Sequence, residues 1–205
     1  MTILHTAHIL VWVLLIVLFY TIRAAQHILI SCLYMSIKPT KNRRPWNRVN
    51  QQVYSLSTCD SKGNINMNIV TYATPATLKP KSYVIAVYRG TKTHANLFDK
   101  SNTHFLLQGL SSVQTKHIRT LGQKSGLKYD KVKYLDKQNL QHFELNNQSY
   151  GYLPDCGFVL LCKLTNSIKY GDHDLITADV VKIVADNKEA KLLTTQELID
   201  KSIIL

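Results

Sequence analysis

The sequence predicts a mainly β fold, either an antiparallel barrel or a sandwich. Several short stretches rich in β-branched and aromatic residues follow one another, separated by glycine, proline or clusters of small polar residues. Few segments have helical periodicity, and strands do not alternate with helices as they do in a doubly wound parallel sheet. These observations indicate antiparallel strands joined by short turns.

The predicted strands share a high content of valine, isoleucine, leucine and aromatic residues. They span Ile65–Ala73, Ser82–Tyr88, Phe105–Leu110, Phe158–Leu164 and Leu175–Val184. Turns are predicted at Asp60–Gly63 and Lys169–Asp172, and Pro75 is expected to end the first strand. This pattern places most of the chain after residue 60 in a β domain.

Two helices are predicted from their capping signals. Ser111 and Gln114 have the spacing of a capping box, and apolar residues at helical intervals continue to Gly122, the expected C-cap. Thr194 begins a second capping box and predicts a helix over Thr195–Ser202. Both helices are short, as expected for helices that pack against a sheet.

Composition indicates a folded domain that attracts anions. Apolar residues make up 45% of the 205 residues and charged residues 19%, which is enough apolar material for a core and too little charge for a disordered chain. The formal net charge is +12, so phosphorylated cofactors, nucleic acid and anionic lipid are the classes of partner to consider. No nucleic-acid-binding signature is present, and specific nucleic-acid binding is therefore not expected.

The cysteines and histidines predict no metal site. The four cysteines form no CxxC motif, and the histidines lack the HExxH spacing. Cys156 and Cys162 are expected to be buried thiols in a reducing compartment rather than a disulfide.

An apolar segment, Ala7–Ile22, precedes the β domain. As a helix, it would extend about 24 Å, less than the roughly 30 Å hydrocarbon core of a bilayer. Basic residues follow it and would keep the next domain cytoplasmic if the segment inserted into a membrane. Two interpretations stay open: a helical membrane anchor, or a leader upstream of a true start at Met35. Residues 1–42 are assigned to this segment and a basic linker, and residues 43–205 to the β domain.

The turn after Ser82–Tyr88 is the first candidate binding site. A buried strand is followed by Arg89, Gly90, Thr91, Lys92 and Thr93, which combine a glycine turn with two hydroxyl groups and two cations. Thr93 is expected to cap a short helix, whose first N–H groups and neighbouring side chains could hold a phosphate. The alternative is an ordinary polar turn of a basic protein.

Two further stretches are candidates for ligand contacts. Thr71, Tyr72, Ala73 and Thr74 put small and hydroxylated residues at a strand end, where a flat ligand could approach the backbone. His173 is expected in a turn between two aspartates, which favour its charged imidazolium form. The alternatives are a strand ended by proline and a solvated histidine.

In their order along the chain, these stretches resemble the flavin reductase-like, FMN-binding split-barrel family. The resemblance extends from about Arg43 to Leu205. It lies in RPWNRVNQQVYSLST (44–58), NMNIVTYATP (66–75), SYVIAVYRGTKTHANL (82–97), LSSVQTKHIRTLGQKSGLKYDK (110–131) and GDHDLITADVV (171–181), followed by LTTQELIDKSII (193–204). No single stretch is specific, and their shared order supports the resemblance.

The resemblance implies a six-stranded antiparallel split barrel of Greek-key topology that works as a homodimer. FMN would lie near the subunit interface, with its ring against Thr71–Thr74 and its phosphate around Arg89–Thr93. NAD(P)H would donate hydride to the flavin, and His173 would line that side of the pocket as the catalytic residue. The expected function is NAD(P)H-dependent reduction of flavin, or of a substrate through bound FMN. The alternative is a non-enzymatic FMN module for electron transfer or storage.

Overall fold

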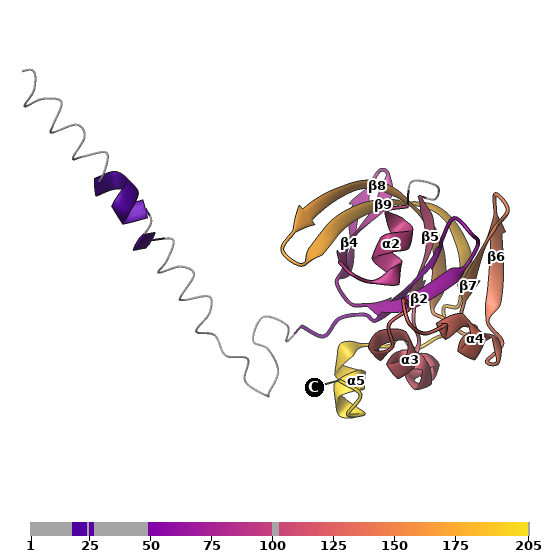
Figure 1. Ribbon diagram of the computed structural model, residues 1–205. Coiled ribbons are helices and arrows are strands. Elements are labelled where there is room, and N and C mark those ends of the chain that lie inside the picture. Colours follow the sequence, from indigo (N-terminus) through magenta and orange to yellow (C-terminus); the bar gives the residue numbers. More distant parts are fainter. Residues whose placement is uncertain (1–17, 24, 27–48, 100–102, 205) are drawn as a thin grey trace, which may run out of the picture. The chain divides into compact units, whose positions relative to one another are not determined.

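The computed structural model describes residues 18–23, 25–26, 49–99 and 103–204 (Figure 1). The chain divides into two compact units, Met1–Arg48 and Val49–Leu205. In the first unit, residues 18–23 are helical, and most of the apolar segment Ala7–Ile22 lies outside the described residues. Within the described part of the chain, no helix has the length and hydropathy needed to span a membrane. The membrane anchor therefore stays a prediction.

The second unit is built on an antiparallel sheet of seven strands, in the order β2-β1-β5-β8-β9-β4-β3, with a separate β6–β7 hairpin. The strands are β1 (Tyr54–Cys59), β2 (Ile65–Val70), β3 (Ala73–Leu78), β4 (Lys81–Tyr88), β5 (His104–Gly109), β6 (Gln141–Leu145), β7 (Gln148–Tyr152), β8 (Phe158–Tyr170) and β9 (His173–Asp186). The main sheet curves around helix α2 (Lys92–Leu97), which contacts β1, β2 and β4 (Figure 1). The predicted mainly β, antiparallel fold is confirmed.

The number of strands differs from the six that the resemblance implies. The predicted strand Ile65–Ala73 is divided, because β2 ends at Val70 and β3 begins at Ala73. Pro75 does not end a strand but lies within β3, where the pairing with β4 shifts register. β3 is at the edge of the sheet, and proline is tolerated there because its missing N–H need not break a ladder on the open side.

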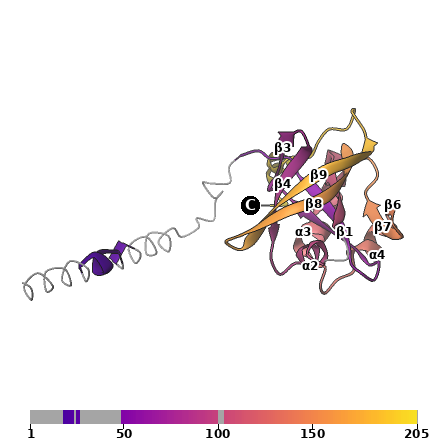
Figure 2. The same cartoon turned by 90° about the horizontal axis from the view of Figure 1, so that it is seen from above.

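The long β8–β9 hairpin corrects the predicted position of His173. The two strands pair as far as Tyr170 and His173, so the predicted turn Lys169–Asp172 shrinks to Gly171 and Asp172. Gly171 has φ of +54°, a left-handed conformation that suits glycine. His173 is therefore the first residue of β9, at the end of a hairpin whose tip projects beyond the rest of the sheet (Figures 1 and 2).

The helices begin near the predicted residues, but their caps differ. The helix predicted after Ser111 is a 3-10 helix, η2 (Ser112–His117), continued by α3 (Ile118–Gln123). Gly122 lies inside α3 and is not its C-cap; a Cβ there would come 2.6 Å from Ile69 Cδ1, so glycine allows α3 to pack on β2. The remaining helices are α4 (Lys131–Asp136) and α5 (Thr195–Asp200), the latter shorter than the predicted Thr195–Ser202.

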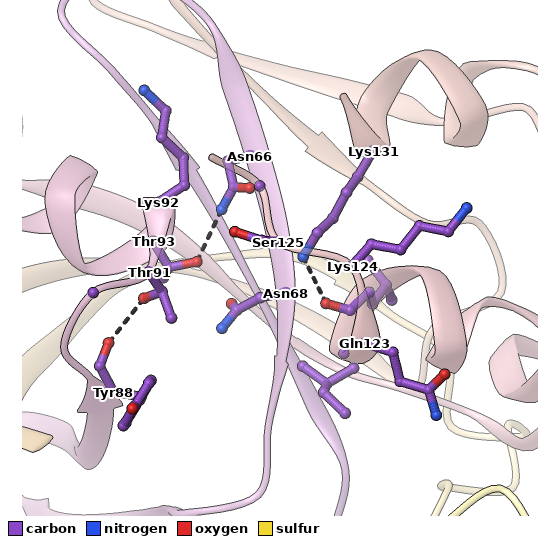
Figure 3. Close-up of a pocket in the computed structure, with 15 residues that line it drawn as sticks. Asn66, Asn68, Tyr88, Thr91, Lys92, Thr93, Gln123, Lys124, Ser125 and Lys131 are labelled. Carbon is purple, nitrogen blue, oxygen red and sulfur yellow. Dashed lines mark hydrogen bonds between the residues drawn. The ribbon is translucent and has the colours of Figure 1, made fainter. Parts of the chain in front are cut away.

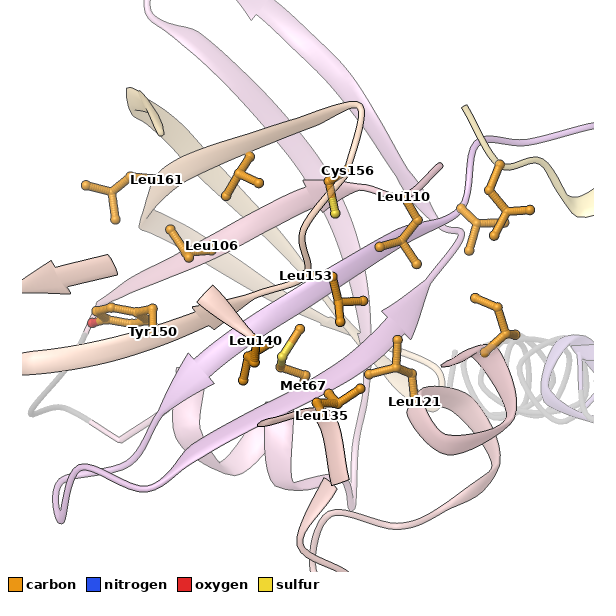
Figure 4. Close-up of a cluster of buried hydrophobic side chains, with 14 of the residues drawn as sticks. Met67, Leu106, Leu110, Leu121, Leu135, Leu140, Tyr150, Leu153, Cys156 and Leu161 are labelled. Atoms are coloured by element: carbon orange, nitrogen blue, oxygen red, sulfur yellow. The ribbon is translucent and has the colours of Figure 1, made fainter. Parts of the chain in front are cut away.

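Two apolar clusters fill the two faces of the curved sheet. The inner cluster contains Leu56, Phe105, Leu107 and Ile176, and α2 adds Leu97 to it. The outer cluster lies where η2, α3, α4 and the β6–β7 hairpin cover the strands (Figure 4). Its labelled members are Met67, Leu106, Leu110, Leu121, Leu135, Leu140, Tyr150, Leu153, Cys156 and Leu161. Because β5 alternates between the clusters, both faces of the sheet are buried along this strand.

The cysteines of the β domain are core residues. Cys59, Cys156 and Cys162 are free and buried, as predicted for Cys156 and Cys162. Burial raises the pKa of the Cys156 and Cys162 thiols to about 12, so both are neutral and unreactive at neutral pH.

Candidate functional site

A cavity of about 420 Å³, which we call the first cavity, lies between β2, the β4–α2 turn and the segment from α3 to α4 (Figure 3). Polar side chains from all three elements line it. They are Asn66 and Asn68, then Thr91, Lys92 and Thr93, then Gln123, Lys124, Ser125 and Lys131. Tyr88 and Gly90 also line the cavity, so four of the predicted phosphate-binding residues, Gly90 to Thr93, are brought together at it.

The β4–α2 turn takes its shape from local hydrogen bonds. Gly90 has φ of +80°, a conformation that reverses the chain after β4. Thr91, not Thr93, caps α2: its hydroxyl accepts from the His94 N–H at 3.1 Å and donates to the Tyr88 carbonyl at 2.8 Å. Thr93 was predicted to be the cap but is the second residue of the helix, and its buried hydroxyl accepts from the Asn66 side-chain amide at 2.9 Å.

The cation of Lys92 is paired with a carboxylate. Its Nζ lies 2.8 Å from Asp60 Oδ2, in the turn between β1 and β2. Desolvation opposes ionisation of Asp60, but hydrogen bonds from Lys92, Asn64 and Lys62 outweigh it and hold the pKa of Asp60 well below its ordinary value. In Figure 3 the Lys92 side chain points away from Thr93, so this lysine borders the first cavity without aiming its charge into it.

The Arg89 side chain binds residues of the β8–β9 hairpin and not the first cavity. Its Nε donates to Asp174 Oδ1 at 2.7 Å, and its other nitrogens donate to the carbonyls of Gly171 and His173. Asp174 also lies 2.8 Å from His94 Nε2, and the hydrogen bonds from His94 and Arg89 lower the pKa of this carboxyl. Arg89 does not line the first cavity; it ties the β8–β9 hairpin to β4.

Lys131 is a buried cation at the wall of the first cavity, and sequence reasoning did not single it out. Only 5% of its surface is exposed, and its Nζ donates to the Leu121 carbonyl at 2.7 Å (Figure 3). Desolvation lowers the pKa of Lys131 to about 8. Among the described residues, no carboxylate forms an ion pair with it. The wall of the cavity thus holds a buried ammonium group that is short of negative charge.

The β2 side of the cavity provides amide groups. Asn66 and Asn68 both point into it (Figure 3). The Asn68 Oδ1 atom is buried and has no hydrogen-bond partner among the described residues. A buried oxygen without a donor is costly, so this atom fits a ligand that brings a hydroxyl or N–H group.

Gly126 allows the α3–α4 segment to approach β2. A Cβ at this position would overlap the Asn66 side-chain oxygen. Asn66 cannot simply rotate away, because its amide also donates to Thr93. A glycine at residue 126 therefore keeps Asn66 and Thr93 in place beside the cavity.

Replacing Gly126 by alanine is expected to weaken ligand binding in the first cavity about tenfold, since the added methyl group displaces Asn66 and breaks its bond to Thr93. Titration with FMN, the ligand that the sequence resemblance implies, checks this. Gly157→Ala is the matched control, because its Cβ would also overlap a side chain, that of Leu192, but neither residue lines the first cavity. Equal affinity in wild type and Gly126→Ala would contradict the assigned role.

The predicted ring-binding residues lie beyond the Tyr88 side of the cavity. Thr71 to Thr74 do not line it. However, the His173 ring lies 5.3 Å from that of Tyr88 and 6.0 Å from that of Tyr72, measured between centroids. Tyr88 and Tyr72 are 53% and 41% exposed, so these three rings form an open aromatic surface next to the cavity. His173 Nδ1 is 2.6 Å from Asp172 Oδ1, which fixes the orientation of the imidazole.

The β domain has a polar cavity that carries a cation and lies next to an aromatic surface. These features make the chain a candidate cofactor-binding protein. The sequence model of the flavin reductase-like domain matches residues 46–199, and the chain belongs to this family. No curated protein matches the chain.

Solved structures share the fold at low sequence identity. An FMN-binding protein from Thermus thermophilus has a TM-score of 0.59 and 16% identity, over 76% of this chain and 85% of that one. Flavoredoxin of Desulfovibrio vulgaris has a TM-score of 0.58 and 16% identity, over 77% of this chain and 83% of that one. An NADH:FAD oxidoreductase of Streptomyces globisporus has a TM-score of 0.60 and 15% identity, over 77% of this chain and 93% of that one. These structures share the fold, and the match of the family model confirms the flavin reductase-like family predicted from the sequence.

Proposed function

We propose that this domain binds a flavin through its 5′-phosphate, with FMN as the expected form, and uses NAD(P)H to reduce the flavin or a substrate through it. The observation that carries the proposal is the buried Lys131 ammonium at the wall of the first cavity. A phosphate monoester supplies the charge that this cation lacks. The names of the similar structures, which include an FMN-binding protein and an NADH:FAD oxidoreductase, support a flavin as the carrier of that phosphate.

The polar groups of the first cavity suit the rest of a flavin's tail. Thr93 lines the first cavity together with Lys131, and its hydroxyl, which accepts from Asn66, keeps its own proton for a phosphate oxygen. The ribityl chain of a flavin carries hydroxyl donors, and the buried Asn68 Oδ1 needs one. We therefore place the phosphate between Thr93 and Lys131, and the ribityl chain along β2.

The ring would extend past Tyr88 toward the aromatic surface formed with Tyr72 and His173. This position agrees with the strand end, Thr71–Thr74, that the sequence resemblance implies, and it leaves Arg89 as a residue that supports the hairpin. When bound, the flavin would supply the group that accepts hydride from the nicotinamide. The chain's own contribution is to hold His173 beside the ring, oriented by Asp172, and to keep the two ligands in contact.

We also expect the domain to form a homodimer. Leu78 on the edge strand β3 is 88% exposed, and Val181 and Ile183 on β9 are more than half exposed. Together with Pro75 and Tyr83 they line an apolar depression of about 400 Å³. An exposed apolar surface next to an open sheet edge is typical of an interface. Light scattering on the purified domain tests this expectation, and a monomer at all concentrations would contradict it.

The reaction itself is tested by mixing the purified protein with FMN and NADH or NADPH and following nucleotide oxidation. Wild type is expected to oxidise at least one nucleotide. His173→Ala should lower kcat/KM for the nucleotide about tenfold through lost positioning, and should weaken FMN binding less, because the contacts of the phosphate and the ribityl chain with the first cavity remain. His142→Ala is the control, since His142 is exposed on the β6–β7 hairpin. No oxidation of either nucleotide by wild type would reject the enzymatic proposal.

The similarity to flavoredoxin supports a second candidate, a flavin-bound electron carrier without nicotinamide turnover. Its expected behaviour is a yellow protein that is reduced by a chemical reductant and reoxidised, with no consumption of NADH or NADPH. The nucleotide-oxidation assay therefore separates the two candidates directly.

A further inference from the structure

Positive charge is concentrated in the segment Ser112–Lys137, which contains η2, α3 and α4. The segment has seven lysine and arginine residues and two aspartates, so it carries a net charge of +5 out of the +12 of the whole chain. One of the seven, Lys131, is buried at the first cavity, and the other six are exposed. We call these six the basic surface: Lys116, Arg119, Lys124, Lys128, Lys133 and Lys137.

The segment turns its apolar side to the sheet and its charged side to solvent. Ile118, Leu121 and Leu135 are buried members of the outer cluster. Both α3 and α4 contact β2 (Figure 1). Because the apolar residues are used in this packing, the cations of the same helices are left on the outward side.

The basic surface is not neutralised by the protein itself. Among the described residues, none of its six cations forms an ion pair, although four other lysine and arginine side chains of the domain do. The aspartates of the segment have other partners: Asp130 accepts from the Lys133 backbone N–H as the cap of α4, and Asp136 Oδ1 lies 3.6 Å from His142 Nε2. The charge is therefore available to an anionic partner.

Apolar side chains are exposed in the same segment. Val113, Leu127 and Tyr129 are 58%, 57% and 38% exposed, and Lys124 Nζ lies 4.1 Å from the centroid of the Tyr129 ring. Exposed leucine and tyrosine beside lysines suit the interface of a lipid bilayer, where apolar groups enter the headgroup region and the cations stay with the phosphates. Nucleic acid would use the cations but gains little from an exposed leucine and valine.

We propose that the basic surface docks this domain on a membrane rich in anionic lipid, with Leu127 and Tyr129 entering the headgroup region. The sequence also favours lipid over nucleic acid. The apolar segment Ala7–Ile22 is followed by five cations and no acid from Lys38 to Arg48, and such a polybasic stretch after an apolar segment is typical of binding to anionic lipid. The proposal adds a partner and does not depend on flavin binding.

Binding of the full-length protein to vesicles tests the proposal. The measured quantity is the affinity for vesicles of phosphatidylcholine and phosphatidylserine in equal parts, divided by the affinity for phosphatidylcholine alone. This ratio cancels the contribution of Ala7–Ile22, which carries no charged residue. Wild type should prefer the anionic vesicles, and the preference should fall as salt is added.

The test variant lacks four cations of the basic surface: Lys116→Gln, Arg119→Gln, Lys133→Gln and Lys137→Gln. The ratio should fall at least about 30-fold, since each cation near an anionic surface contributes about fivefold. FMN affinity should not change, because none of the four residues lines the first cavity. The matched control removes the same charge from exposed lysines outside the segment: Lys79→Gln, Lys163→Gln, Lys169→Gln and Lys188→Gln. It should keep the ratio within about threefold, because cations away from the lipid are screened.

A single substitution tests the apolar contact. Leu127→Gln should weaken binding to the anionic vesicles about fivefold, since the leucine no longer enters the headgroup region. Ile168→Gln is the control, because Ile168 on β8 is 60% exposed but lies outside the segment. It should leave vesicle binding unchanged.

Four results would overturn the proposal. Wild type without a preference for anionic vesicles would show that the basic surface does not bind lipid. Equal losses in the two fourfold variants would show that net charge alone attracts the protein. Full vesicle binding by Leu127→Gln would reject the entry of this residue into the headgroup region. A fourfold basic-surface variant that loses affinity for a DNA duplex but keeps its vesicle preference would assign the surface to nucleic acid.

Discussion

Lys131→Met is expected to weaken FMN binding by about 30-fold to 100-fold, the loss typical of a charge-assisted hydrogen bond to a phosphate. Methionine keeps the length of the side chain and suits a buried position, so the change removes the ammonium without opening a large cavity. Riboflavin has the same ring and ribityl chain but no phosphate, and its affinity should change little. The comparison of the two flavins isolates the contact with phosphate.

Lys133→Met is the matched control, because Lys133 lies on the same helix, α4, but is exposed. It should leave both affinities within about twofold. The assignment of Lys131 fails if Lys131→Met weakens riboflavin and FMN alike, since a general disturbance of the site would then explain the loss. It also fails if FMN affinity does not change.

Lys131→Met should also make the ligand-free protein more stable near neutral pH, by up to about 3 kcal/mol. In the folded state the pKa of Lys131 falls from 10.5 to about 8, so the folded protein holds this proton less tightly than the unfolded chain does. The cost of burying the ammonium is fully present below about pH 8 and disappears as the pH rises toward 10.5. The stability difference between variant and wild type should therefore be largest below pH 8 and shrink above it.

Chemical denaturation of both proteins at several pH values measures this difference. The comparison with the variant is necessary because the buried thiols of Cys156 and Cys162 act in the opposite direction: their raised pKa values cause stability to be lost above about pH 9, where the unfolded thiols ionise. Both proteins contain these cysteines, so their contribution cancels. A stability difference that stays constant from pH 7 to about pH 10 would show that Lys131 is not buried as a charged group.

The same site illustrates what could be read from the sequence. Gly90 to Thr93 are contiguous, and a glycine turn with hydroxyls after a β strand is visible as a pattern, so this part of the cavity was predicted. Lys131 and Asn68 become site residues only because β2 and the α3–α4 segment pack against that turn. Nothing in their local sequence distinguishes them from the other lysines and asparagines of a basic protein.

What the sequence could not show has similar physical causes. Arg89 has the right chemistry for a phosphate, but Asp174, distant in the sequence, pairs with it across neighbouring strands. Tyr72 and His173 were predicted separately, and their proximity depends on the pairing of β4 with β9 and on the Tyr72 carbonyl bonding the Ala86 N–H. The β6–β7 hairpin was missed because strands such as Gln141–Leu145 have too few apolar residues to show a clear alternation.

A crystal structure of the protein with bound riboflavin 5′-phosphate would test most directly whether the first cavity is the flavin site. The proposal predicts the phosphate within hydrogen-bonding distance of Lys131 Nζ and the Thr93 hydroxyl, with the ring against Tyr88 and His173. A phosphate held by Arg89, or a flavin bound outside the cavity, would contradict it.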